Sequence, residues 1–423
     1  MEWIVIAIFA ASLIFCVGAG ISVVYALLIG LACFYFYARK QGNDAKTSRA
    51  MFIEGISSIR LIIVILTMIG MLTASWRAGG IIAYILHYAA SLINPSYFAL
   101  FAFLICTVMS ILTGTSFGTA GTAGVICINM AQYMGLDPYV VGGAIISGIF
   151  VGDRCSPMSS SALLVASITK TDIWTNIRIM LKTSWVPFLL CCVAYALVGR
   201  FERISSPAAS STVDFLGQFN MSPWLLLPVI IIIGMCIMRI KIYITIGVSI
   251  LCSAVICFFM QDMAVGEIVK SLIFGYYAGE GNLMNGGGAL SMLEVLIIVI
   301  ISSSYIGVFS KTPILQGIKD AVSKMALKLR PFTVTTILSI IISGISCNQT
   351  LATMLSHEMQ KDLVEEPLKQ AEYLENSVIL IAALIPWGIA GAVPLAMIGA
   401  PPVTLLFAVY LYVVPIWNIL MKR

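Results

Sequence analysis

Long apolar runs recur along this chain, separated by short polar segments, as in Ile242 to Met260 and Leu293 to Phe309. Each run approaches the roughly 20 residues that an α-helix needs to cross a bilayer. Hydrophobic residues make up 60% of the 423 residues and charged residues only 10%, whereas about a quarter of a soluble protein is charged. The sequence therefore predicts an all-α polytopic protein that is integral to a membrane and contacts the lipid bilayer. We expect spans at about 3–18, 21–38, 59–74, 97–112, 139–151, 184–198, 223–238, 242–260 and 293–309.

The composition argues against several classes of function. The net charge of +5 comes from Lys and Arg residues that cluster in a few loops, as orientation signals do, so nucleic acid is not an expected partner. The 11 cysteines are scattered through apolar runs without a C-x-x-C pair, which indicates neither a metal site nor a disulfide framework. No nucleophile with a base and no phosphate loop stands out, so we expect no enzyme and no cofactor.

The basic residues also predict an orientation. Arg39, Lys40, Lys46 and Arg49 follow the second apolar run, and loops rich in Lys and Arg lie on the cytoplasmic side. This places the N-terminus in the cytoplasm, and we expect a bacterial inner (plasma) membrane. The first apolar run lacks a basic start and continues almost directly into the second, which indicates a retained helix rather than a signal peptide.

A polar stretch from Gly114 to Ser161 interrupts the apolar sequence with GTSFGTAGTAGV and GDRCSPMSSS. Irregular backbone at membrane depth is tolerated only where it is buried in protein or lines a wet cavity. The alternative is close helix packing through small residues. Asp153 and Arg154 follow an apolar run, and ionisable residues within a membrane are functional candidates, or else a mutual ion pair.

The two halves of the chain resemble each other. The stretch near Thr115 matches SGISCNQTLATM from Ser343, and the break at Gly152 to Pro157 matches Ile385 to Pro394, at a spacing close to 230 to 236 residues. Interrupted helices at matching positions of two inverted repeats indicate a secondary transporter with its site between the repeats.

Loop charge predicts that the two halves are inverted. Residues 76–96 hold a single Arg, whereas the matching residues 310–330 hold five Lys and Arg residues, so the two loops are expected on opposite sides of the membrane. The domain organisation that we expect is peripheral N-terminal helices at 1–50, repeat 1 with a hairpin at 51–199, a linker at 200–222, peripheral helices at 223–290 and repeat 2 with a hairpin at 291–423.

The runs LTASWRAGG, LTGTSFGTAGTAGV, GAIISGIFVGDRCSPMSSS and ALIPWGIAGA resemble the NhaC-type sodium/proton antiporter family, within a broader ion transporter superfamily. The resemblance covers about residues 55–400. It implies two opposed re-entrant helical hairpins and broken helices. It also implies exchange of sodium for protons, coupled in some members to a small organic anion.

The chain departs from the family pattern at three positions. The family pattern has a carboxylate where this chain has Ser160, and an acidic residue where it has Asn376. The residue after Pro-Trp, often Asn in the family, is Gly388. The acids that remain near the expected site are Asp153, Glu375 and Glu358.

Hydroxyl, amide and exposed carbonyl oxygens at such breaks are suitable ligands for a dehydrated Na⁺. The predicted substrate- or ion-binding residues are Thr115, Ser116, Thr119, Asp153, Ser156, Ser159, Ser160, Ser346, Asn348, Thr350, Asn376 and Trp387. Within this set Na⁺ is expected at Ser159, Ser160, Asn348 and neighbouring backbone carbonyls, and the proton carriers are expected to be Asp153 and Glu375. The alternative for each Ser and Thr is a hydrogen bond to its own helix.

The function predicted from these features is a secondary active transporter, an NhaC-like Na⁺/H⁺ antiporter that works by alternating access. An alternative is a transporter that couples Na⁺ or H⁺ to a small organic acid or amino acid, which the missing acid at Ser160 favours. A membrane protein without transport function is a remote alternative. The coupling ions are Na⁺, H⁺ or both, the other partner is a small ion or small organic anion, and a homodimer is left open.

Overall fold

The computed structural model describes residues 2–19, 21–57, 59–89, 93–201, 218–238, 240–280, 282, 284–312, 314, 328–361 and 363–421. Within these ranges the backbone forms helices and no strand, apart from an isolated bridge between Tyr276 and Gly286. Six of the helices are long and apolar enough to cross a membrane, or seven spans if a pair bent by 56° counts as one. The expected class, an all-α polytopic membrane protein, is confirmed.

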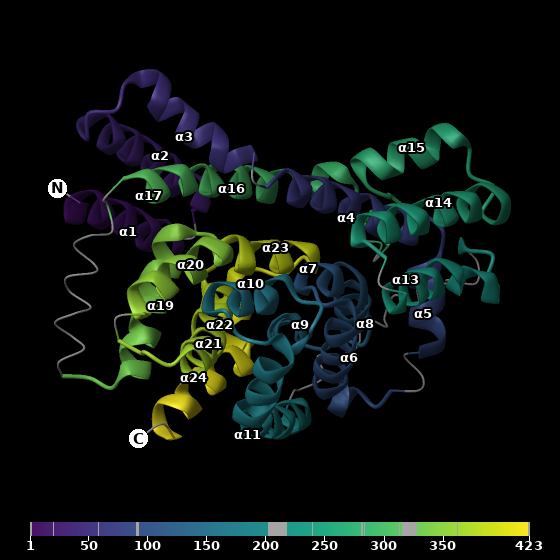
Figure 1. The fold of residues 1–423 in the computed structure, drawn as a ribbon. Helices are drawn as coiled ribbons and strands as arrows, with labels where there is room; N and C mark the ends of the chain where they lie inside the picture. Colours follow the sequence, from purple (N-terminus) through teal and green to yellow (C-terminus); the bar gives the residue numbers. More distant parts are fainter. Residues whose placement is uncertain are drawn as a thin grey trace.

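A peripheral layer of helices lies along the top of the molecule and extends down its right-hand end in the view of Figure 1. Its elements are α1 (Glu2–Gly18), α2 (Val23–Lys40), α3 (Ala45–Ser57), α4 (Arg60–Ala78), α5 (Ile81–Ala89), η3 (Pro223–Leu226), α13 (Leu227–Ile237), α14 (Ile242–Met260), α15 (Val265–Phe274), η4 (Ala289–Met292), α16 (Leu293–Ser304) and α17 (Ile306–Lys311). The layer interleaves the two halves of the chain, because α4 packs against α14 and α15 whereas α16 packs against α2 and α3.

Four aromatic side chains fix the N-terminal helices to the second half. The rings of Phe9, Phe34, Tyr305 and Phe309 meet edge to face, with the Phe34 and Tyr305 centroids 4.9 Å apart. The Tyr305 hydroxyl also donates a hydrogen bond to the Leu27 carbonyl of α2. Such aromatic pairs contribute about 0.5–1.5 kcal/mol each beyond the area that they bury, so this cluster anchors α1 and α2 on the segment between α16 and α17.

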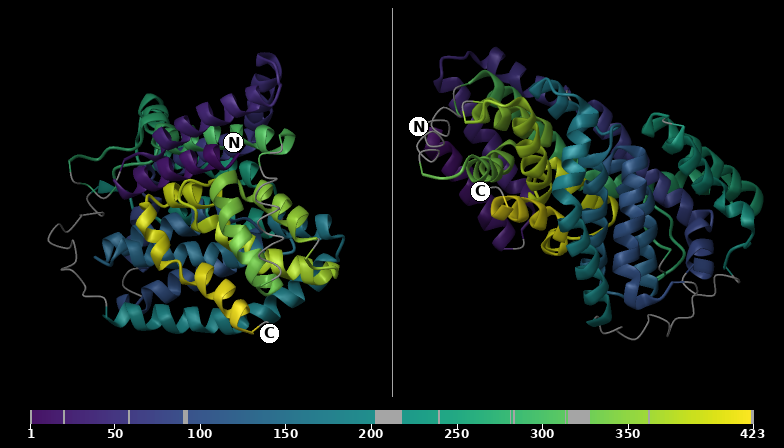
Figure 2. Two further views of the ribbon diagram at one scale, coloured as in Figure 1. Left: turned by 90° about the vertical axis from the view of Figure 1, so that its left-hand side faces the viewer. Right: turned by 60° about the horizontal axis from the view of Figure 1, so that its bottom comes forward.

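The core carries the interrupted helices of both halves. Figure 2 shows its first-half helices, in blue and teal, beside those of the second half, in yellow-green. Its elements are η1 (Pro95–Tyr97), α6 (Phe98–Thr113), α7 (Ser116–Thr119), η2 (Ala120–Gly124), α8 (Val125–Tyr133), α9 (Pro138–Cys155), α10 (Ser160–Thr169), α11 (Ile173–Phe201), α19 (Pro331–Ser346), α20 (Gln349–Gln360), α21 (Pro367–Asn376), α22 (Val378–Ile381), η5 (Ala382–Leu384), α23 (Ile389–Met397), η6 (Pro402–Phe407) and α24 (Val409–Met421).

Helices α6 and α9 pack closely in the core, and two glycines one helical turn apart permit it. A Cβ added at Gly148 would lie 2.5 Å from the Phe103 carbonyl oxygen, and one at Gly152 would lie 2.1 Å from the Ser110 carbonyl carbon. Small residues four apart let transmembrane helices touch in this way. The close packing sets the end of α9 beside the break that follows α6.

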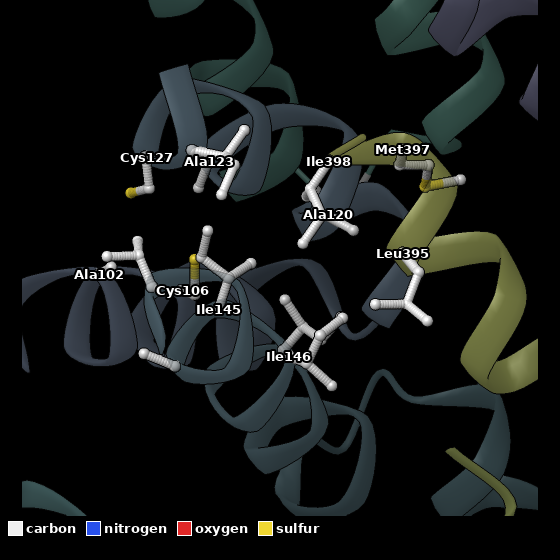
Figure 3. Packing of buried hydrophobic residues seen from close by; sticks show 14 of the residues in the cluster. Ala102, Cys106, Ala120, Ala123, Cys127, Ile145, Ile146, Leu395, Met397 and Ile398 are labelled. Atoms are coloured by element: carbon white, nitrogen blue, oxygen red, sulfur yellow. The ribbon is translucent and has the colours of Figure 1, made fainter. Parts of the chain in front are cut away.

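Buried apolar side chains join the two halves at the same place. Figure 3 shows Cys106 of α6, Ala120 of η2, Ile145 and Ile146 of α9 and, from the end of α23, Ile398. All five are at most 4% exposed. The first-half and second-half segments therefore share one packed interior rather than two separate ones.

Two of the expected segments fall largely outside the described residues. They are the linker at 200–222 and the basic loop at 310–330, for which the structure describes only the flanks. The domain boundaries and the opposite orientation of the halves therefore stay predictions. The expected span at 184–198 belongs to the longer helix α11.

Candidate functional site

Each half of the core contains a helix break of the same form. Helix α6 ends at Gly114 in the left-handed region (φ 66°, ψ 21°), and Thr115 follows in extended conformation before α7. Helix α19 ends at Cys347 (φ 55°, ψ 9°), and Asn348 follows in extended conformation before α20. The predicted match between the stretches near Thr115 and Ser343 therefore falls on two breaks with matching backbone.

A second break in each half is a turn that contains a proline. After α9 the chain runs through Ser156, Pro157 and Met158 to Ser159, whose N–H donates to the Ser156 carbonyl over 3.1 Å. The counterpart at residues 385–388 closes the same turn over 3.0 Å. Proline removes a backbone donor and disfavours helical geometry in the residue before it, which explains why both helices stop there.

Side chains from these turns satisfy carbonyls that the first breaks leave open. Ser156 Oγ donates to the Ile111 carbonyl over 2.7 Å, and Trp387 Nε1 donates to the Gly344 carbonyl over 2.8 Å. The last carbonyls of a helix lack partners within that helix. Ser156 thus links the two breaks of the first half, and Trp387 links the two breaks of the second half.

Asp153 lies at the point where the two halves meet. Its side chain is 3% exposed. Its Oδ2 accepts hydrogen bonds from Ser161 Oγ over 3.0 Å and from Gln349 Nε2 over 3.3 Å. Ser159 Oγ lies 3.4 Å from Oδ1. The backbone of Ser116 also faces this carboxylate, so the acid of α9 is surrounded by the starts of α7, α10 and α20.

The groups around Asp153 supply the oxygen atoms that a hard cation prefers. They are the two carboxylate oxygens, the hydroxyls of Ser159 and Ser161, and the amide oxygen of Gln349, which lies 3.4 Å from Ser161 Oγ. Hard cations take carboxylate, amide and hydroxyl oxygens as ligands. The residues present therefore fit a hard monovalent or divalent cation.

Two residues with oxygen atoms in this cluster, Ser161 and Gln349, were not predicted from the sequence. Ser161 and Gln349 each lie one residue beyond a predicted ligand, Ser160 and Asn348 respectively. Ser159 and Asn348 are the N-cap residues of α10 and α20, and the Asn348 side chain accepts from the Leu351 N–H over 3.0 Å. An N-cap side chain turns toward its own helix. The additional contacts to the Asp153 carboxylate come from Gln349, one position after its cap, and from Ser161, two positions after its cap.

The remaining predicted hydroxyls lie elsewhere. Thr119 Oγ1 donates to the Thr115 carbonyl over 3.0 Å and Ser346 Oγ donates to the Asn348 carbonyl over 3.3 Å, as in the alternative of local hydrogen bonding. Ser160 and Thr350 are exposed. The structure therefore gathers Asp153, Ser116 and Ser159 and leaves these other residues outside the cluster.

Arg154 faces away from Asp153 into a separate polar cluster. It is fully buried, and its guanidinium donates to the Glu375 carbonyl and to the Tyr410 hydroxyl, each over 3.0 Å, and to the side chain of Asn376. Successive residues of a helix point about 100° apart, since one turn holds 3.6 residues. The alternative of an Asp153–Arg154 ion pair is not formed; Arg154 instead ties α9 to α21 and α24.

Glu375 is the second buried acid of the core. Its side chain is 0% exposed, and neither carboxyl oxygen has a hydrogen-bond partner among the residues that the structure describes. It belongs to α21, beside α10 and α11. Burying an ionised carboxylate without hydrogen-bond donors is costly, which sets Glu375 apart from Asp153 with its three side-chain neighbours.

The comparison with known families decides the class of protein. A model of the Na⁺/H⁺ antiporter family matches residues 2–169 and 148–422, which together span nearly the whole chain. The chain belongs to the Na⁺/H⁺ antiporter family. The resemblance seen in the four sequence motifs is therefore confirmed, and the protein is an integral membrane transporter of an antiporter family for sodium and protons.

The proteins similar to this chain differ in what their names say they exchange. The Na⁺/H⁺ antiporter NhaC of Alkalihalophilus pseudofirmus is 28% identical over 421 residues, 95% of this chain and 89% of its own. The malate-2H⁺/Na⁺-lactate antiporter of Bacillus subtilis is 27% identical over 389 residues, 88% of this chain and 81% of its own. The arginine/ornithine antiporter ArcD of Halobacterium salinarum is 24% identical over 355 residues, 80% of this chain and 73% of its own.

Proposed function

We propose that this protein exchanges Na⁺ for H⁺ across a bacterial inner membrane, with its N-terminus in the cytoplasm, and that Na⁺ binds at Asp153. The observation that carries the proposal is the contact between Asp153 of α9, Ser161 of α10 and Gln349 of α20. An intramembrane acid lined with oxygen donors is suited to a cation. The Na⁺/H⁺ antiporters among the relatives support the choice of ion.

Glu375 is the proton carrier in this proposal. Its carboxyl group has no described hydrogen-bond donor to stabilise a negative charge, so a bound proton removes the cost of burying it. Asp153, by contrast, has Ser161 and Gln349 within hydrogen-bond distance. In this proposal Asp153 binds the Na⁺ ion and Glu375 binds the proton.

Alternating access is the mechanism that best accounts for this arrangement. Residues 51–199 and 291–423 are the two proposed inverted repeats. Support comes from the matching breaks at Gly114 and Cys347 and from the proline turns at residues 156–159 and 385–388. A site between two repeats is exposed to each side in turn when one moves against the other. The hydrogen bond from Gln349 to Asp153 spans the two proposed repeats.

Transport by purified protein in sealed vesicles tests the proposal. An imposed Na⁺ gradient is expected to drive proton movement, followed with a pH-sensitive dye inside the vesicles. Asp153→Asn removes the charge that holds Na⁺ and should abolish the signal. Asp262→Asn is the matched control, because Asp262 is exposed and has a positive φ of 52°, which Asn also adopts readily. Equal proton movement in the wild type and Asp153→Asn would overturn the proposal.

A further inference from the structure

A cavity of about 250 Å³ lies beside the proposed Na⁺ site and is not explained by it. One wall comes from the breaks of the first half and carries the hydroxyl groups of Thr113, Thr115 and Ser160. Lys241 and Ile242, at the start of α14 in the peripheral layer, also line the cavity. The cavity therefore lies between the core and the peripheral layer.

The charge of this cavity favours an anion. Lys241 is the one charged side chain among its described lining residues. No ion pair of Lys241 occurs within the part of the chain that the structure describes. Ser160 is exposed, as Lys241 is, and its hydroxyl has no hydrogen-bond partner among the described residues. A lysine ammonium with nearby hydroxyl donors binds a carboxylate through charge-assisted hydrogen bonds.

The size and walls of the cavity limit the class of anion. Pockets for drug-sized ligands occupy about 300–1,000 Å³, so a cavity of about 250 Å³ suits a smaller metabolite. Leu112 and Ile242 supply apolar surface for a short carbon skeleton. The single ammonium group of Lys241 balances the charge of a monocarboxylate better than that of a dicarboxylate.

We propose that this cavity binds a small monocarboxylate, with Lys241 as its charged partner. The proposal rests on the proposed function, because the cavity adjoins the Na⁺ site. Ser160 lines the cavity between Ser159 and Ser161, which face Asp153, and Thr115 precedes Ser116. A Na⁺ ion bound at Asp153 adds positive charge close to the anion and strengthens its binding, and the anion strengthens Na⁺ binding by the same factor.

Calorimetric titration of the purified full-length protein tests this site, with L-lactate as the probe and L-malate and inorganic phosphate as competing probes. L-Lactate is expected to bind the wild type, more tightly in Na⁺ than in its absence, and more tightly than either competitor. Lys241→Gln should weaken L-lactate binding by about tenfold, which corresponds to losing one charge-assisted hydrogen bond of about 1.4 kcal/mol. Lys270→Gln is the matched control, since Lys270 is an exposed lysine of α15 that does not line the cavity.

A second variant, Ser160→Leu, fills the cavity without changing its charge and should also weaken L-lactate binding. Absence of L-lactate binding to the wild type would overturn the proposal, as would unchanged binding in Lys241→Gln. Phosphate that binds as tightly as L-lactate would instead indicate a general anion or lipid-phosphate site and overturn the monocarboxylate class. Na⁺/H⁺ exchange without L-lactate binding would refute this inference alone, whereas L-lactate binding through Lys241 without Na⁺/H⁺ exchange would refute the proposed function alone.

Discussion

Gln349 Nε2 donates a hydrogen bond to Asp153 Oδ2 over 3.3 Å. The bond joins the start of α20 in the second half to the end of α9 in the first. Gln349 also donates to the Ile379 carbonyl over 2.9 Å, which holds its side chain in place. Because Gln349 of the second half donates to Asp153 of the first half, a movement of one half against the other would change the hydrogen bonds of the Asp153 carboxylate.

The adjacent residues Asn348 and Gln349 are predicted to separate structure from ion binding. Gln349→Ala removes an oxygen ligand and should raise the Na⁺ concentration for half-maximal transport by about fivefold, equivalent to roughly 1 kcal/mol. Asn348→Ala removes the cap of α20 and should lower the free energy of unfolding by about 1 kcal/mol, with transport per folded molecule retained. Thermal stability and Na⁺-dependent flux, measured on the same preparations, check both outcomes; a reversed pattern would make Asn348 the ligand.

Ser161→Ala is predicted to weaken Na⁺ binding, because the Ser161 hydroxyl lies 3.0 Å from the Asp153 carboxylate. An effect of about 1 kcal/mol, or roughly fivefold in affinity, is expected for one neutral ligand. Ser167→Ala on the same helix is the control, since Ser167 is exposed. Na⁺ titration of the thermal unfolding temperature measures both variants, and equal Na⁺ responses would exclude Ser161 as a ligand.

Glu375→Gln is predicted to uncouple the proton from Na⁺. The amide cannot release a proton, so exchange should stop at every pH between 6 and 9, while Na⁺ still binds at Asp153. Glu365→Gln is the control, because Glu365 is exposed just before α21. Exchange assays between pH 6 and 9 together with Na⁺ binding measure the two functions separately. A Glu375→Gln protein with wild-type exchange would show that another group carries the proton.

Gly152→Ala is predicted to destabilise the contact between α6 and α9. The added Cβ would lie 2.1 Å from the Ser110 carbonyl carbon, and overpacking of this kind costs about 1–3 kcal/mol. Gly234→Ala in α13 is the control, since a Cβ there meets nothing within 4 Å. The thermal unfolding temperature should fall for Gly152→Ala only, because alanine forms helices better than glycine and does not destabilise an uncrowded helix position. A fall of equal size in Gly234→Ala would show that the loss is not specific to the contact between α6 and α9.

The sequence predicted the helical membrane class and the positions of the breaks, because glycine, proline and hydroxyl residues are unusual within apolar runs. Among the residues around Asp153 it predicted Ser159, but it did not predict that Ser161 and Gln349, rather than Ser160 and Asn348, face the carboxylate. That choice depends on where each helix begins, since one residue turns a side chain by about 100° around the axis. Ser160 and Asn348 have the expected chemistry, but the caps at Ser159 and Asn348 shift the facing positions to Ser161 and Gln349.

The hydrogen-bond partners of Arg154 could not be predicted from the sequence, for a different reason. They come from α11, α21 and α24, far along the chain, and three of its acceptors are the Glu375 carbonyl, the Tyr410 hydroxyl and the Asn376 amide oxygen. Asn376 was singled out from the sequence as a predicted ligand and Glu375 as a proton carrier, but neither was predicted as a partner of Arg154. Neutral acceptors carry no charge pattern that identifies them in advance.

Equilibrium binding of radioactive ²²Na⁺ to the purified protein tests the central claim most directly. The account predicts saturable binding to the wild type and to Asp262→Asn, no saturable binding to Asp153→Asn, and binding weakened by about fivefold in Gln349→Ala. Each variant is first shown to be folded by its thermal unfolding transition. Saturable ²²Na⁺ binding of wild-type affinity in a folded Asp153→Asn protein would contradict the account.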